Sequence, residues 1–184
     1  MFPLVDPFEL LGLTRRPLLS EEEIGSAYRK MAGTLHPDQE GGDEGRFKEL
    51  GEAAAILRDP ARRLRFLSGV RPGSIPPPEA ADLFPRVASL THEADDLLAR
   101  HATASNPLAK AVLAAPLRKL SADLDLLLMT IGQWRSRLNE HLGILDARWP
   151  DHDPEVVADL ADSFSYATRW ESQLREKKLA LECL

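Results

Sequence analysis

The spacing of apolar residues constrains this chain more than any other feature of its sequence. Apolar side chains recur three and four residues apart over long segments, which places them on one face of a helix. In the second half the pattern runs through Leu83, Val87, Leu90, Ala94 and Leu97, then through Leu117, Leu120, Leu124, Leu127, Ile131, Trp134 and Leu138, and last through Val157, Leu160, Phe164, Ala167 and Leu174. No segment shows the sustained period of two, rich in Val, Ile and Thr, that a strand needs. The sequence therefore predicts an all-α fold.

Residues that favour helix starts stand where these patterns begin. Ser20 and Glu23 have the spacing of a capping box, in which each side chain binds the other residue's backbone N–H. Elsewhere an Asp or Asn precedes a proline whose missing N–H costs nothing in a first helical turn. These pairs are Asp6-Pro7, Asp59-Pro60, Asn106-Pro107 and Asp153-Pro154. With breaks at 102–106 and 149–153, we expect the second half to form an up-down-up antiparallel three-helix bundle.

The first half predicts a helical hairpin with an exposed tip. Its two apolar stripes run through Ile24, Tyr28, Met31 and Leu35 and through Phe47, Leu50, Ala54 and Leu57. Pro37 disfavours helical backbone at His36, and Gly41 with Gly42 lets the chain reverse, so residues 36–42 are expected to form a turn. Two such helices must pack antiparallel to bury both stripes, and a short helix around residues 8–11 would cover one side.

A change in composition separates the two halves. Residues 69–78 read GVRPGSIPPP, and three consecutive prolines favour an extended, semi-rigid backbone. The expected organisation is a helical hairpin domain in residues 1–68, a Pro/Gly linker in 69–78 and the three-helix bundle in 79–184.

Composition and missing motifs argue against several classes of function. A net charge of −6 opposes non-specific attraction to nucleic acid. The longest apolar stretches, such as 124–131, are far shorter than the roughly 20 residues of a membrane-spanning helix, and no basic region precedes an apolar core at the N-terminus. We therefore expect a cytoplasmic protein with no membrane partner. With a lone Cys183, and no ligand cluster, phosphate loop or nucleophile motif, we predict no metal, no cofactor and no enzyme activity.

The tripeptide His36-Pro37-Asp38, at the predicted tip, is the one that defines J-domains. Its surroundings agree with that family. Residues 6–13 (DPFELLGL) resemble the family's first helix, residues 27–32 (AYRKMA) its second, and residues 47–54 with 56–63 its third and the start of its fourth. Because order, spacing and helix phase all match over residues 5–67, this segment is identified as a member of the J-domain (DnaJ-like) family.

This resemblance implies a co-chaperone that stimulates ATP hydrolysis by a partner chaperone of the seventy-kilodalton heat-shock type. In that family the histidine packs at the contact, the proline fixes the loop and the aspartate meets an arginine of the partner, and these roles pass to His36, Pro37 and Asp38. A carboxylate and an arginine that are partly desolvated together form a directional, charge-assisted pair. The other expected chaperone-binding residues are Tyr28, Arg29, Lys30 and Arg62.

Two departures from the family pattern leave a second hypothesis open. Gln39 stands where a lysine is common, and residues 21–23 (EEE) make the start of the second helix acidic, which should weaken attraction to an acidic partner surface. The alternative is a structural or regulatory adaptor with a partly degenerate J-domain. A cluster of arginines near the fourth helix has two interpretations, further partner contacts or solvated helix faces. Its members are Arg58, Arg62, Arg63 and Arg65.

A J-domain joined by a short linker to a three-helix bundle, in a chain of this size, resembles the HscB family of iron–sulfur cluster co-chaperones. Residues 56–60, with Arg62, Phe66 and Leu67, resemble that family's junction helix, whereas residues 79–184 match in architecture without an aligned motif. The resemblance implies that the bundle binds a client, such as an iron–sulfur cluster scaffold protein. Burial is the ordinary role of the three tryptophans, and an exposed aromatic patch would indicate a client site.

Overall fold

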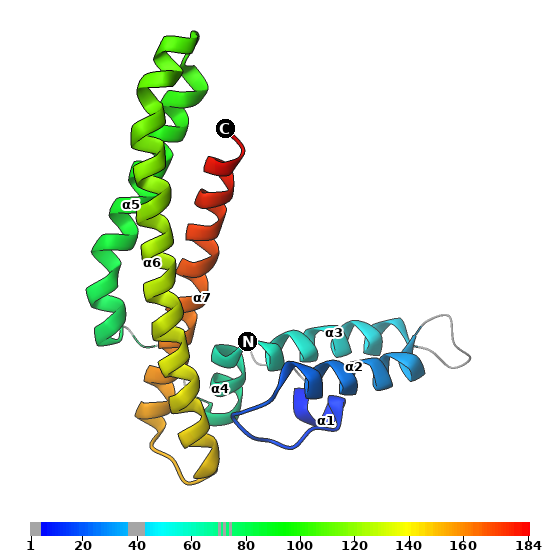
Figure 1. The fold of residues 1–184 in the computed structure, drawn as a ribbon. Coiled ribbons are helices and arrows are strands. Elements are labelled where there is room, and N and C mark those ends of the chain that lie inside the picture. The colour runs from blue at the N-terminus through cyan, green and yellow to red at the C-terminus, as the bar shows by residue number, and fades with distance from the viewer. Residues whose placement is uncertain (1–4, 37–42, 70, 72, 74) are drawn as a thin grey trace. The chain divides into compact units, whose positions relative to one another are not determined.

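The computed structural model describes residues 5–36, 43–69, 71, 73 and 75–184. Within them the chain is helical and contains no strand, as the apolar spacing predicts (Figure 1). The helices are α1 (Pro7–Leu11), α2 (Glu21–Leu35), α3 (Glu44–Arg58), α4 (Pro60–Ser68), α5 (Pro78–Thr103), α6 (Pro107–Ala147) and α7 (Pro154–Glu182). None of the described helices is long and apolar enough to cross a membrane.

The chain forms two compact units whose limits cut through two helices. One unit contains Met1–Ser74 and Asn139–Asp162, and the other contains Ile75–Leu138 and Ser163–Leu184. The last turns of α6 and the first turns of α7 therefore belong to the same compact unit as α1 to α4.

The first helices of the first unit begin and end where their capping residues stand. Asp6 Oδ1 accepts the Phe8 N–H at 2.8 Å, and Gly12 ends α1 with a φ of 66°, which a glycine adopts without strain. The predicted capping box is present: Glu23 donates its N–H to Ser20 Oγ (3.1 Å), and its carboxylate accepts the Ser20 N–H (2.7 Å). The local chemistry of the sequence thus sets the entrance to α2.

Helices α2 and α3 pack antiparallel, with α1 lying across them (Figure 1). Their core contains Phe8, Leu11, Leu19, Ile24, Leu50, Ala53, Ala54 and Leu57. The outer members of the predicted stripes, Tyr28, Met31, Leu35 and Phe47, are half-buried, so the core is densest away from the tip. The helical hairpin is therefore as predicted.

Two carboxylates join the two segments of this unit, Met1–Ser74 and Asn139–Asp162. We call the second segment the corner between α6 and α7. Asp146, in the last turn of α6, accepts the Leu18 N–H at 2.9 Å. Asp162, in α7, accepts Arg65 Nη2 at 2.6 Å and the Gly73 N–H at 2.6 Å. Because Asp162 is only 7% exposed, its pair with Arg65 is shielded from water.

The arginine cluster near α4 does not act as one surface. Arg63 is 2% exposed, donates from Nε to the Pro17 carbonyl at 2.7 Å, and also donates to the Leu57 carbonyl. Burial lowers the pKa of Arg63 to about 10, while the charges of Asp59 and Asp146 oppose that shift. For Arg63, both interpretations offered for the cluster, partner contact and solvated face, are wrong. Arg65, which pairs with Asp162, also has a structural role.

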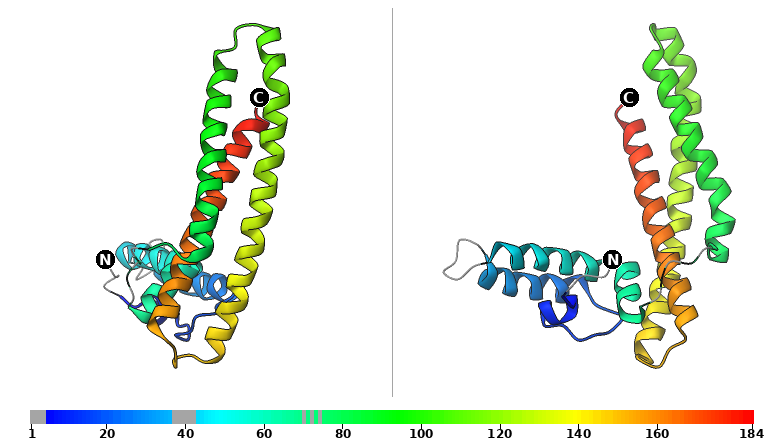
Figure 2. Two further views of the ribbon diagram at one scale, coloured as in Figure 1. Left: turned by 90° about the vertical axis from the view of Figure 1, so that its left-hand side faces the viewer. Right: turned by 180° about the vertical axis from the view of Figure 1, so that it is seen from behind.

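In the second unit, α5 and α7 run in one direction and α6 in the other, which confirms the up-down-up bundle (Figure 2). The predicted apolar positions face inward: Leu124, Leu127 and Ile131 of α6 and Phe164 of α7 are fully buried. Ion pairs also link the helices, including Arg135 with Glu171 (3.3 Å), Lys177 with Asp95 (2.6 Å) and Lys178 with Asp125.

Candidate functional site

His36 stands where α2 ends, at the edge of the predicted tip. Its N–H donates to the Ala32 carbonyl at 3.0 Å, and its backbone then leaves the helix with a ψ of 133°. The half-buried imidazole packs edge-on against Phe47 of α3, with ring centroids 5.3 Å apart and an interplanar angle of 76°. This contact fixes the imidazole between the two helices of the hairpin.

The start of α3 lies next to the end of α2. The Asp43 N–H donates to the Leu35 carbonyl at 3.3 Å, and the Asp43 side chain accepts the Arg46 N–H at 3.1 Å, which caps α3. The ends of α2 and α3 are thereby closed by a backbone hydrogen bond. The other predicted tip residues, Pro37, Asp38 and Gln39, lie outside the described residues.

Tyr28 and two basic residues follow one another on α2. The half-buried Tyr28 ring lies beneath the guanidinium of Arg58 from α3, which is 5.8 Å from the ring centroid. Arg29 and Lys30 are exposed. Eight residues of helix separate Tyr28 from His36, a rise of about 12 Å. The structure therefore places Tyr28, Arg29 and Lys30 on α2, and His36 at the C-cap of the same helix.

Arg62 lies apart from that group. It is exposed on α4, where its backbone N–H donates to Asp59 at 3.2 Å, and none of the described contacts connects its side chain to α2. Its predicted role in chaperone binding stays a prediction.

Two of the acidic side chains at the start of α2 form hydrogen bonds and ion pairs with nearby residues. Glu21 accepts Arg58 Nε at 2.8 Å, and Glu23 accepts Arg16 Nη2 at 2.8 Å in addition to its bond with Ser20. The Ser20 backbone N–H, more than any other group, holds the pKa of the Glu23 carboxyl below its ordinary value. Two of the three acids are thus balanced by arginines.

An aromatic surface on the bundle has no counterpart among the predicted site residues. Phe84 of α5 is 57% exposed, and its ring centroid lies 6.5 Å from that of Trp170 of α7. Tyr166 packs against the same tryptophan at 5.2 Å, and the Arg169 guanidinium lies 4.9 Å over the Tyr166 ring. We call Phe84, Tyr166, Arg169 and Trp170 the aromatic patch.

The sequence carried a signal for this patch. Phe84 directly follows Leu83, a member of the apolar stripe of α5, so it points away from the stripe and is a large apolar residue on the outer face of the helix. Trp134 and Trp170 are buried as expected, at 2% and 3% exposure. Trp149 is half-buried and stacks on His152 at 4.3 Å.

The described residues contain no group of three or more His, Cys, Asp or Glu side chains that could hold a metal ion. The candidate binding features of the described residues are an imidazole fixed at a helix end, exposed basic residues and an aromatic patch in which Phe84 is exposed.

Sequence relatives match the N-terminal part of this architecture. The family model for the DnaJ domain matches residues 6–66. Chaperone protein DnaJ from Deinococcus proteolyticus is 44% identical over 75 residues, which are 39% of this chain and 24% of that protein. A DnaJ homolog subfamily C member 7 homolog from Schizosaccharomyces pombe is 47% identical over 68 residues, 35% of this chain and 14% of that protein. The chain thus matches less than a quarter of the length of these relatives.

A solved structure matches nearly the whole chain. Chaperone HscB from Vibrio cholerae superposes with a TM-score of 0.61 over 96% of this chain and 99% of that one, at 16% sequence identity. At such low sequence identity, this structural match shows a shared fold. Residues 6–66 therefore match the DnaJ domain, and the all-α fold of the chain is similar to that of HscB.

Proposed function

We propose that this protein stimulates ATP hydrolysis by a chaperone of the seventy-kilodalton heat-shock type and delivers to it a client bound on the helical bundle. The observation that carries this proposal is the DnaJ domain of residues 6–66, in which Phe47 fixes the imidazole of His36 at the end of α2. DnaJ domains and the HscB fold are not catalytic enzyme families, so the chemistry belongs to the partner.

In this mechanism the chain binds one conformation of the chaperone more tightly than the other. Arg29 and Lys30 attract an acidic surface of the partner, and His36 and Pro37 pack at the contact. Asp38 forms a charge-assisted pair with an arginine of the partner. A ligand shifts an equilibrium only by binding one state more tightly, so docking favours the hydrolysis-competent state of the chaperone. Closure of the chaperone then traps the delivered client.

The ion pairs of α2 favour an activator over the alternative of a degenerate adaptor. The adaptor hypothesis depends in part on repulsion by the acids at residues 21–23. Because Arg58 pairs with Glu21 and Arg16 with Glu23, the net negative charge at this end of α2 is smaller than the sequence implies. The basic residues nearer the tip can therefore dominate the field that the partner meets.

The aromatic patch is the proposed client site. Exposed aromatic residues beside an arginine are the side chains most enriched at the energetic centres of protein interfaces. Phe84 is more than half exposed and is backed by the buried Trp170, so it presents a rigid apolar contact. The HscB-like fold supports an iron–sulfur cluster scaffold as the client. A cytoplasmic location and the lack of a nucleic-acid partner stay predictions.

Binding of the ATP-loaded chaperone to the full-length chain, measured by surface plasmon resonance, tests the first half of the proposal. We expect saturable binding that His36→Gln weakens at least tenfold, because the imidazole lies at the contact. His92→Gln makes the same chemical change at an exposed position of α5 and should leave binding unchanged. Equal binding by His36→Gln and the unaltered chain would favour the adaptor hypothesis.

Capture of clients from a lysate of the source organism tests the second half. The full-length chain should recover an iron–sulfur cluster scaffold protein, identified by mass spectrometry. Phe84→Asp should reduce recovery roughly 30-fold, the effect of losing an interfacial anchor worth about 2 kcal/mol. Leu108→Asp alters another exposed apolar residue of the bundle, at 77% exposure, and serves as the matched control. Undiminished recovery with Phe84→Asp would exclude the aromatic patch as the client site.

A further inference from the structure

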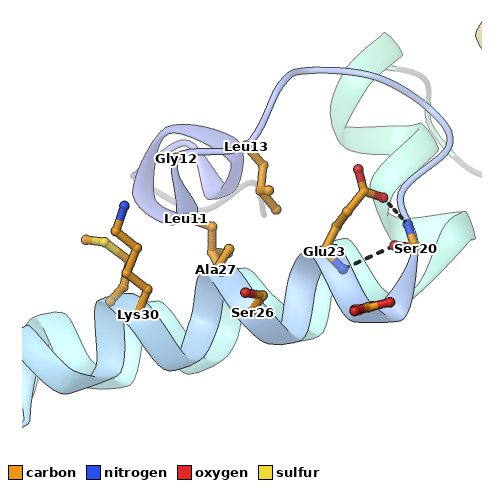
Figure 3. A pocket seen from close by; sticks show the side chains of 10 residues that line it. Leu11, Gly12, Leu13, Ser20, Glu23, Ser26, Ala27 and Lys30 are labelled. Carbon is orange, nitrogen blue, oxygen red and sulfur yellow. Dashed lines mark hydrogen bonds between the residues drawn. The ribbon is translucent and has the colours of Figure 1, made fainter.

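A groove runs along the first part of α2, on the side that faces α1 (Figure 3). It has a volume of about 520 Å³ and is bordered by the end of α1, the segment that follows it and α2. Its lining residues are Leu11, Gly12, Leu13, Ser20, Glu22, Glu23, Ser26, Ala27, Lys30 and Met31. Leu13, Ala27 and Met31 are only half-buried, so apolar surface remains accessible within the groove.

The groove carries opposite charges at its two ends. Lys30 lies at one end and Glu22 near the other, and both side chains are exposed without an ion pair among the described residues. Eight residues of α2 separate them, a rise of about 12 Å. Ser20 and Glu23 also line the groove, but they are engaged with each other in the capping box. The groups left for an occupant are therefore one cation, one anion, the Ser26 hydroxyl and the apolar side chains between them.

This charge pattern selects among possible occupants. The exposed Glu22 disfavours polyanions such as nucleic acid or an anionic membrane surface. An apolar surface with charges of opposite sign about two helical turns apart matches an amphipathic helix that carries an acidic residue, an apolar face and a basic residue in that order. We propose that the groove binds such a helix of a partner protein, with its acidic side chain on Lys30 and its basic side chain on Glu22.

The proposed site is separate from the chaperone-binding residues except at Lys30. Residues 28 and 29 lie outside its lining, and His36 lies beyond its end. The inference goes beyond the proposed function, because the occupant of the groove is a partner helix that the chaperone contact does not require. Variants that test it therefore leave Lys30 unchanged.

A defined synthetic peptide provides the probe. It is an alanine-based helix of about 16 residues, long enough to populate helix in water, with Glu and Lys eight positions apart and two leucines between them on the same face. The full-length chain, labelled with 15N, is titrated with this peptide and its amide chemical shifts are recorded. We expect saturable shifts at Leu11, Gly12 and Ala27. Peptides with two Glu or two Lys at the charged positions should bind at least threefold more weakly.

Ser26→Trp fills the groove from an exposed position and should weaken binding at least tenfold. Ala55→Trp makes a similar enlargement at an exposed position of α3 outside the groove and should bind as the unaltered chain does. Three results would overturn the proposal: no saturable shift with the dipolar peptide, equal affinity for all three peptides, or unimpaired binding by Ser26→Trp. The peptide comparison uses the unaltered chain, so it decides the question even if Ser26→Trp folds poorly.

Discussion

Glu23 takes part in both the capping box of α2 and an ion pair. Its carboxylate accepts the Ser20 N–H and also pairs with Arg16, so its negative charge is favoured in the folded chain. The Ser20 N–H is the main cause of the lowered pKa of this carboxyl, followed by the Ser20 hydroxyl; Arg16 contributes less. The folded state therefore binds a proton at this site less readily than the unfolded state does.

This lowered pKa predicts a specific dependence of stability on pH. The contribution of the charge is fully present above the ordinary carboxyl pKa of 4.5 and is lost as the pH falls through the lower pKa of the folded state. At pH 7, Glu23→Gln should lower the free energy of unfolding by about 0.5 kcal/mol, a small value because the pair is exposed to solvent. Urea unfolding followed by circular dichroism should show this difference.

The same measurement repeated as the pH is lowered below 4.5 provides the check, because the unaltered chain then loses the charge that Glu23→Gln lacks throughout. The difference in free energy of unfolding between Glu23→Gln and the unaltered chain should largely disappear. A difference that stayed constant down to acid pH would show that the amide disturbs the capping box itself, and the electrostatic explanation of Glu23 would be wrong.

Helix α4 is held in part by a partner that is distant in the sequence. Arg65 of α4 reaches Asp162, 97 residues along the chain, and Asp162 also accepts the Gly73 N–H. Removing one partner of a charged hydrogen bond that is shielded from water costs more than removing one from an exposed pair, because the partner left behind stays poorly solvated. The corner between α6 and α7 is therefore part of the support of the DnaJ domain.

Asp162→Asn should destabilise this corner by about 1–3 kcal/mol, because the amide keeps the shape of the side chain but not the charge that balances Arg65. Hydrogen exchange of the α4 amides should become faster by the corresponding factor. Asp96→Asn is the matched control: its pair with Arg100 is exposed on one helix face and should contribute below about 0.5 kcal/mol. Equal effects of the two substitutions would contradict a structural role for the corner.

The sequence predicted the elements that depend on near neighbours and missed those that depend on distant ones. The capping box at Ser20 and the buried stripe of α6 follow from residues within a few positions of each other, and local rules describe both. The hydrogen bond between Leu18 and Asp146 joins residues 128 positions apart and follows no period. The burial of Arg63 could not be predicted for the same reason, because tertiary packing creates it.

For the whole molecule, two helices belong to both compact units. Helices α6 and α7 supply Asn139–Asp162 to the unit that contains the DnaJ domain, and the rest of each helix forms the bundle. A fragment that ended after the linker would lose the partners of Arg65 and Leu18. Experiments on this protein are therefore best made with the full-length chain, in which both units keep their contacts.

The candidate site was also only partly accessible from sequence. His36, Arg29 and Lys30 were predicted from a resemblance to a family. The spacing of apolar residues alone does not reveal a binding role for the residues of a turn or for exposed basic residues. The contact between His36 and Phe47 required coordinates, as did the exposure of Phe84. The candidate site therefore combines a motif that the sequence identifies with surfaces that can be recognised only from the packing of the folded chain.

Single-turnover ATP hydrolysis by the cognate chaperone, with and without this protein, tests the central claim most directly. We predict that the full-length chain accelerates hydrolysis at least tenfold and that His36→Gln removes most of the acceleration, whereas His92→Gln retains it. If the unaltered chain binds the chaperone but leaves its rate of hydrolysis unchanged, the protein is not an activator and the proposed function is wrong.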